Sequence, residues 1–197
     1  MKRKMLNYNQ LKKVIEAKGY KFFEGDLNIN LVGVRSKDIV TNEFDDTLLV
    51  AIEIGGEKQV ISFGEFTTDP GFYYLKEKHL NSKGCAILKP GQYRGMWGFG
   101  KHRGKYNALV QVGNCTVYRD RNKDNTIDTE SEQTGLFGIN HHHAYDAKNI
   151  DKYSAGCQVH SRDEQLNVVL SLCYLSSVKW GNTFSYTLLE LNDFKNV

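Results

Sequence analysis

The stretch TLLVAIEIGGEKQVISFGEF, residues 47–66, decides the fold of this chain. Its two ends, Thr47–Ile54 and Val60–Phe66, are rich in the β-branched and aromatic residues that favour strands. Gly55-Gly56 between them is a dipeptide that accepts the positive φ angles of a tight hairpin turn. The stretch therefore predicts a β-hairpin.

Further strand-like segments of the same character lie on both sides of this hairpin. They are Leu27–Arg35, Ala86–Leu88, Gly91–Gly98, Ala108–Val112, Thr116–Arg119 and Phe184–Leu191. Short strands separated by turns roughly every 8–12 residues are typical of a β-sandwich or barrel. We therefore expect a mainly β protein.

Two segments have helical spacing instead. Residues 8–18 place Leu11, Val14 and Ile15 on one face, before Gly19. Residues 163–179 repeat apolar side chains in the same way, with Ser161 or Asp163 as the cap. The predicted fold class is mainly β (α+β), with a short N-terminal helix and one helix after Cys157. We expect residues 1–46 to be integrated with a single compact unit over residues 47–197.

The composition argues against two classes of function, nucleic-acid binding and membrane insertion. Of 197 residues, 40% are hydrophobic and 25% are charged, and the formal net charge is +3. The basic start, Lys2, Arg3 and Lys4, is typical of a solvated helix end rather than a nucleic-acid surface. No apolar run approaches the roughly 20 residues of a membrane span, so we expect no membrane insertion. Residues 1–19 hold no apolar h-region, so we expect cytoplasmic synthesis without a signal peptide.

The four cysteines differ in their surroundings. Cys85, Cys115 and Cys173 lie in apolar contexts, and we expect them to be inert core residues. Cys157 lies among polar and glycine residues in Ser154-Ala155-Gly156-Cys157. With no CxxC spacing, free thiols are the expected state.

A histidine run precedes Cys157 by one loop. Residues 138–143 read Gly-Ile-Asn-His-His-His, and His142 stands fifteen positions before Cys157. An imidazole beside a thiol can accept its proton, which makes the thiol a nucleophile for acyl transfer through a thioester. A tight turn at Ser154 and Gly156 could aim the Gly156 and Cys157 backbone N–H groups at an oxyanion. The alternative is that Cys157 packs in the core and the histidines form a solvated loop.

Two patterns in the sequence suggest a metal-binding site. Of the three histidines only His141 and His143 could face one zinc ion, with His160 or Cys157 as a further ligand, but no HxxxH or CxxC supports such a site. The run Asp120, Asn122, Asp124 and Asp128 resembles the start of a calcium loop. It lacks the glycine and glutamate of that loop, so a hairpin loop built from Asx turns is favoured.

Several segments, taken in order, resemble the L,D-transpeptidase (YkuD-type) catalytic domain of peptidoglycan enzymes. The matching segments are Phe66–Gly71, Lys89-Pro90-Gly91-Gln92-Tyr93, Gly138–His142 and Ser154–Val159. The last corresponds to the family's Ser-His-Gly-Cys-Ile-Arg. The resemblance implies a YkuD-like β-sandwich or barrel over roughly residues 47–175, acting on stem peptides without a cofactor.

The resemblance also implies roles for individual residues. Cys157 matches the nucleophile and His142 the general base, with His141 as the alternative base. Gly156 and Ser154 match the turn around the thiol, and Asn140 and Tyr93 match positions near the substrate.

Two positions depart from the family pattern. Ala155 stands where the family has a histidine, and Val159 where it often has an arginine. The second change removes a contact to a substrate carboxylate, for which Arg94 or Arg162 could substitute.

The segment Asn30–Lys37 adds a likeness to phage and Bacteroidota peptidoglycan hydrolases of this fold. We therefore expect an endolysin-like cysteine hydrolase of stem-peptide amides, reaching the periplasmic wall after holin-type release or in a virion. The alternatives are a cross-linking L,D-transpeptidase, or a non-catalytic wall-binding or virion structural module on the same fold.

Overall fold

The computed structural model describes residues 6–37 and 39–195. Lys2, Arg3 and Lys4 lie outside these residues. The elements in chain order are α1 Tyr8–Ala17, β1 Asn30–Arg35, β2 Asp46–Ile54, β3 Glu57–Thr67, η1 Tyr73–Glu77, β4 Cys85–Leu88, β5 Gly91–His102, β6 Tyr106–Gln111, β7 Cys115–Asp120, β8 Glu132–Gly135, β9 His141–His143, β10 Gln158–His160, α2 Asp163–Trp180, β11 Thr183–Glu190 and η2 Leu191–Phe194.

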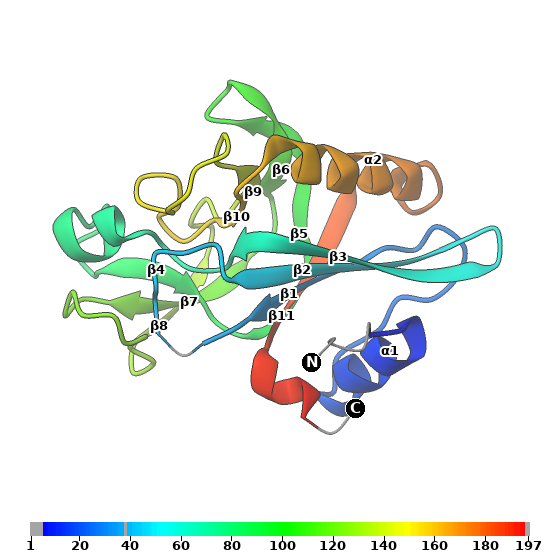
Figure 1. Ribbon diagram of the computed structural model, residues 1–197, viewed down its shortest axis with the longest axis horizontal. Coiled ribbons are helices and arrows are strands. Elements are labelled where there is room, and N and C mark those ends of the chain that lie inside the picture. The colour runs from blue at the N-terminus through cyan, green and yellow to red at the C-terminus, as the bar shows by residue number, and fades with distance from the viewer. Residues whose placement is uncertain (1–5, 38, 196–197) are drawn as a thin grey trace.

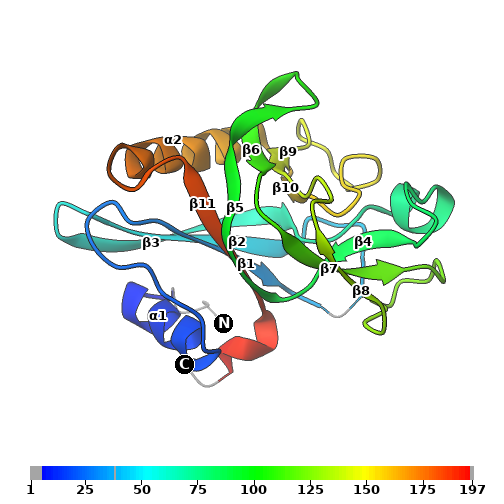
Figure 2. The ribbon, with the colours of Figure 1, turned by 180° about the vertical axis from the view of Figure 1, so that it is seen from behind.

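Eight of the strands form a closed barrel, in the order β1-β11-β5-β6-β9-β10-β3-β2. A smaller sheet, β4-β7-β8, lies beside one end of the barrel (Figure 1). Helices α1 and α2 lie on opposite sides of the long β2–β3 hairpin, as both views show (Figure 2). The expectation of a mainly β protein is confirmed.

The predicted hairpin is present and is one wall of the barrel. Gly55 and Gly56 form its turn with φ angles of 59° and 89°, which L side chains rarely adopt. Strand β1 then pairs in parallel with β11 and antiparallel with β2. This pairing brings residues 30–35 into the barrel.

Helix α1 matches its prediction, with Asn7 as the N-cap and Gly19 just beyond the end at φ 76°. The predicted cap of α2 is wrong. Arg162 is the N-cap without a side-chain cap bond, and Asp163 is already helical. The Ser161 hydroxyl donates to the Ala147 carbonyl instead (3.3 Å), so it does not cap the helix.

Several strand boundaries also differ from the prediction by two or more residues, including the starts of β3 at Glu57 and of β6 at Tyr106. The first strand begins at Asn30 rather than Leu27, because Leu27 adopts a φ of 63°, outside the strand region. Strand β5 continues past Gly98 to His102, through glycines that leave room for neighbouring side chains. The longer β5 matters for the site, because its end carries His102.

The barrel interior holds a polar network as well as apolar side chains. Arg35 is 3% exposed and forms an ion pair with Asp69 (Nε–Oδ1 3.0 Å). It also donates to the Thr68 hydroxyl (3.0 Å), and Asp46 accepts from the same hydroxyl (2.8 Å). Since buried charges need such partners, the network fixes the turn that follows β3.

None of the helices in the described ranges is both long and apolar enough to cross a bilayer.

Candidate active site

The strands β9 and β10 bring the histidine run and Cys157 together. They are parallel neighbours, with His141 opposite Gln158 and His142 opposite Val159. Val159 lies on the same face as His142, because residues in register share a face. Cys157 stands two positions before Val159 and lies on that face too, since side chains alternate along a strand. Cys157 and His142 therefore share one face of the sheet, and His141 lies on the other.

The tight turn before Cys157 is held by one hydroxyl and one glycine. Ser154 Oγ accepts from the Gly156 N–H (3.1 Å) and donates to the Cys157 carbonyl (2.9 Å). Gly156 has φ 120°, and a Cβ there would lie 2.2 Å from the Ala86 carbonyl oxygen. Only glycine fits this position without strain.

Gln158 connects this turn to the interior of the barrel. Its amide nitrogen donates to the Thr68 carbonyl (3.3 Å), and its amide oxygen accepts from the Tyr186 hydroxyl (2.6 Å). Gly71 N–H in the same region donates to the Ser154 carbonyl (2.9 Å). The segment after β3, which contains Thr68 and Gly71, therefore holds the turn that precedes Cys157 in place.

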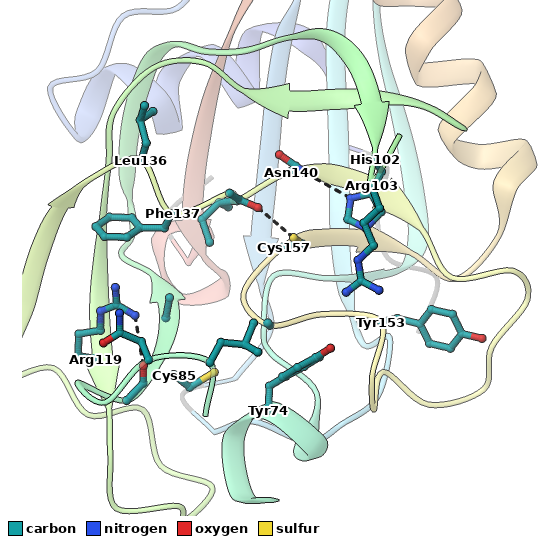
Figure 3. Close-up of a pocket in the computed structure, with 17 residues that line it drawn as sticks. Tyr74, Cys85, His102, Arg103, Arg119, Leu136, Phe137, Asn140, Tyr153 and Cys157 are labelled. Carbon is teal, nitrogen blue, oxygen red and sulfur yellow. Dashed lines mark hydrogen bonds between the residues drawn. The ribbon is translucent and has the colours of Figure 1, made fainter. Parts of the chain in front are cut away.

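Cys157 lies on the wall of a cavity of about 490 Å³ (Figure 3). Of the four free cysteines it is the one that is partly exposed, while Cys85, Cys115 and Cys173 are buried as expected. The described residues that line the cavity are Tyr74, Leu80, Asn81, Gly84, Cys85, Ala86, His102, Arg103, Arg119, Leu136, Phe137, Gly138, Ile139, Asn140, Tyr153, Ala155 and Cys157.

The Cys157 thiol is neutral in this arrangement. It donates a hydrogen bond to the Gly138 carbonyl (3.4 Å). Burial raises its pKa to about 11, although the Asn140 backbone N–H and the charge of Arg103 act in the opposite direction. A base must therefore take the proton when the thiol reacts.

His142 is the imidazole on the same sheet face as Cys157, although it is not among the described residues that line the cavity. Its Nδ1 donates to the His143 carbonyl (3.0 Å), which leaves Nε2 without a proton. Nε2 is buried and has no hydrogen-bond partner among the described residues. Burial, followed by the charge of His102, lowers the pKa of His142 to about 3, so the ring is neutral at pH 7.

His102 is a second imidazole that sequence reasoning missed. Its ring stacks on His142 with 3.8 Å between centroids, and it lines the cavity. Asn140 donates from Nδ2 to His102 Nδ1 (3.3 Å), since its Oδ1 already accepts from the Gln111 N–H (2.9 Å). His102 Nε2 therefore carries the proton, and burial lowers its pKa to about 4.

His141, the expected alternative base, lies on the opposite face of the sheet from Cys157. It is buried against Trp97, Phe66 and His160, with ring centroids 5.1, 5.6 and 4.9 Å away. Burial lowers its pKa well below the usual value. This ring therefore packs inside the barrel, away from the cavity that Cys157 lines.

The oxyanion arrangement differs from the expected one. Gly156 N–H is occupied by the Ser154 hydroxyl, so it does not point freely into the cavity. Cys157 N–H has no protein acceptor within the described part of the chain. One of the two expected backbone donors is therefore left.

The expected substrate contacts are divided between the cavity and other places. Asn140 lines the cavity, but Arg94, Arg162 and Tyr93 are not among its described lining residues. Arg94 stacks on Phe23, and Arg162 pairs with Glu65. Tyr93, on barrel strand β5, donates to the Thr116 carbonyl (3.1 Å) of β7 in the smaller sheet.

Arg103 and Arg119 are the cavity cations. They lie 54 and 38 positions from Cys157 in the sequence, and no local spacing rule connects them with it. For Arg103, the sequence did offer one signal: the polar segment His102-Arg103-Gly104 is a short turn at the end of a strand.

The loop after β7 is built from Asx turns. Asn122 Oδ1 accepts from the Asp124 N–H (3.0 Å), and Asp124 Oδ1 accepts from the Thr126 N–H (2.6 Å). Asn122 also donates to Asp128 (3.0 Å), and Asp120 accepts from the Asp128 N–H (3.3 Å). In the described ranges, no group of three or more His, Cys, Asp or Glu side chains is arranged to hold a metal ion.

Comparison of the chain with protein-family models, with curated proteins and with solved structures finds no match. The resemblance to L,D-transpeptidase domains therefore stays a prediction.

Proposed function

We propose that the chain is a cysteine hydrolase that cleaves amide bonds in the stem peptides of peptidoglycan. The observation that carries the proposal is the position of Cys157. It is the partly exposed cysteine, and it lies on the wall of a cavity. It also lies on the same sheet face as His142, whose Nε2 has no hydrogen-bond partner among the described residues. The substrate class rests on the order of the motifs that resemble L,D-transpeptidases.

The proposed reaction begins from a neutral pair. Cys157 Sγ attacks the amide carbonyl while its proton moves to His142 Nε2. The Cys157 N–H donates to the oxyanion, and His142 returns the proton to the leaving amine. Water then hydrolyses the thioester, giving a free carboxylic acid and the original thiol.

A non-catalytic wall-binding module is the second candidate. It is favoured by the same burial that raises the pKa of Cys157 and lowers the pKa of His142, since neither group is ionised at rest. The cross-linking transpeptidase shares the first half of the reaction and differs in the acceptor, an amine in place of water.

Digestion of purified sacculi tests the proposal. Wild-type protein should release muropeptides, and mass spectrometry should find products that have gained one water. Cys157→Ala should lower the rate by at least about 10³-fold, because it removes the nucleophile. Cys173→Ala is the matched control, since Cys173 lies on the buried face of α2 outside the cavity, and the variant should leave the digestion active.

Each alternative has its own outcome. Newly cross-linked products with no gain of water would indicate the transpeptidase. Muropeptides identical to those of untreated sacculi, together with sedimentation of the protein on the sacculi, would replace the proposal with the binding module.

A further inference from the structure

The charges around the cavity are of one sign. Arg103 and Arg119 line it, and none of the described lining residues is an aspartate or a glutamate. Figure 3 places the two arginines on opposite sides of Cys157. A cavity of this kind favours an anionic ligand that extends to both sides of the thiol.

Arg119 is the fixed member of the pair. Its side chain comes from β7, and the residue is only 7% exposed. Its Nε donates to Gln133 Oε1 (2.7 Å), and another nitrogen donates to the Gly84 carbonyl (3.2 Å). The guanidinium also lies 4.9 Å from the centroid of the Phe137 ring. These contacts orient the guanidinium before any ligand arrives.

All the protein partners of Arg119 in the described residues are neutral. The other strongly buried arginine, Arg35, has a carboxylate at 3.0 Å, and the exposed Arg162 has one at 2.9 Å. No ion pair joins Arg119 to any described carboxylate. Of the acidic neighbours, Glu132 pairs with Lys89. Asp120 accepts from the Asp128 N–H through Oδ2, and its buried Oδ1 has no hydrogen-bond partner among the described residues.

A buried cation without a counter-charge is costly to keep. Burial accordingly lowers the pKa of Arg119, although the group stays protonated at neutral pH. A carboxylate that entered the cavity would supply the missing charge and could accept two parallel hydrogen bonds from the guanidinium.

We propose that Arg119 binds a carboxylate of the stem peptide and so positions the peptide across Cys157. This inference rests on the proposed function for its substrate class. It assigns to Arg119 the contact that the sequence had suggested for Arg94 or Arg162. A carboxylate is favoured over other anions because a stem peptide carries carboxyl groups beside its amide bonds.

Calorimetric binding to the Cys157→Ala protein tests this proposal without turnover. The probes are a stem tetrapeptide and a set of analogues in which one carboxyl group at a time is amidated. Arg119→Gln should weaken binding of the unmodified peptide by about 10- to 100-fold, the effect of losing a charge-assisted pair. One amidated analogue should bind equally weakly to both proteins, because it already lacks the group that Arg119 contacts.

Arg121→Gln is the matched control, an exposed arginine two residues away that does not line the cavity. It should bind every probe as the parent does. Arg119→Lys keeps a cation and should retain part of the affinity, and it replaces Arg119→Gln if the loss of the Gly84 contact prevents folding.

Three results would overturn the inference: unchanged affinity in Arg119→Gln, an equal loss for every amidated analogue, or no binding of the unmodified peptide to the parent. Sacculus digestion by the wild type reports on the proposed function separately, so the failure of one can be told from the failure of the other.

Discussion

At the scale of the residue, the site is a neutral thiol beside neutral imidazoles. The sequence indicated Cys157 and His142 from their spacing and from the glycine and serine around the thiol. It did not indicate His102 or Arg119, because the pairing of β6 with β9 and of β4 with β7, strands distant in sequence, brings them to the cavity. Burial is a property of the whole fold, and it sets the protonation of both groups.

This protonation state predicts the pH dependence of alkylation. The pKa of Cys157 is raised to about 11, so its thiolate fraction is small at pH 7 and grows as the pH rises. The rate of iodoacetamide modification at Cys157 should increase about tenfold per pH unit between pH 7 and 10. Peptide mass spectrometry at each pH gives the rate, with buried Cys115 as the internal comparison. A rate that is already constant from pH 5 to 8 would mean a preformed thiolate–imidazolium pair.

At the scale of the element, short strands build the site. The hairpin of β2 and β3 and the helix α1 were predictable, because hydrophobic period and glycine turns specify them locally. Strands β9 and β10 are only three residues each, too short to show an alternating pattern of apolar and polar residues. They exist because β6 and β3 supply partners on either side, which sequence patterns do not reveal.

The turn before β10 leads to a prediction about the free energy of unfolding. Gly156→Ala should destabilise the protein by about 2–4 kcal/mol, since it combines a strained φ with a clash against the Ala86 carbonyl. The melting temperature should fall by roughly 5–15 °C. Gly64→Ala is the control, because its Cβ would meet no atom within 4 Å and its φ is not positive. Equal melting temperatures for the two variants would show that the turn is not clamped as described.

At the scale of the whole molecule, the barrel connects distant segments to one thiol. Arg35 on β1 binds the turn after β3, and that turn holds Gln158 and the Ser154 carbonyl. The mainly β class followed from composition and turn spacing. Closure of the barrel did not, because the β1–β11 pairing joins residues about 150 positions apart.

Covalent capture of Cys157 tests the central claim most directly. A carbapenem reacts with an acyl-transfer nucleophile to leave a stable adduct, and intact-mass spectrometry detects it. The account predicts one adduct per chain, located on Cys157, absent in Cys157→Ala and formed more slowly in His142→Gln. No adduct on the folded wild type, or an adduct that persists in Cys157→Ala, would contradict it.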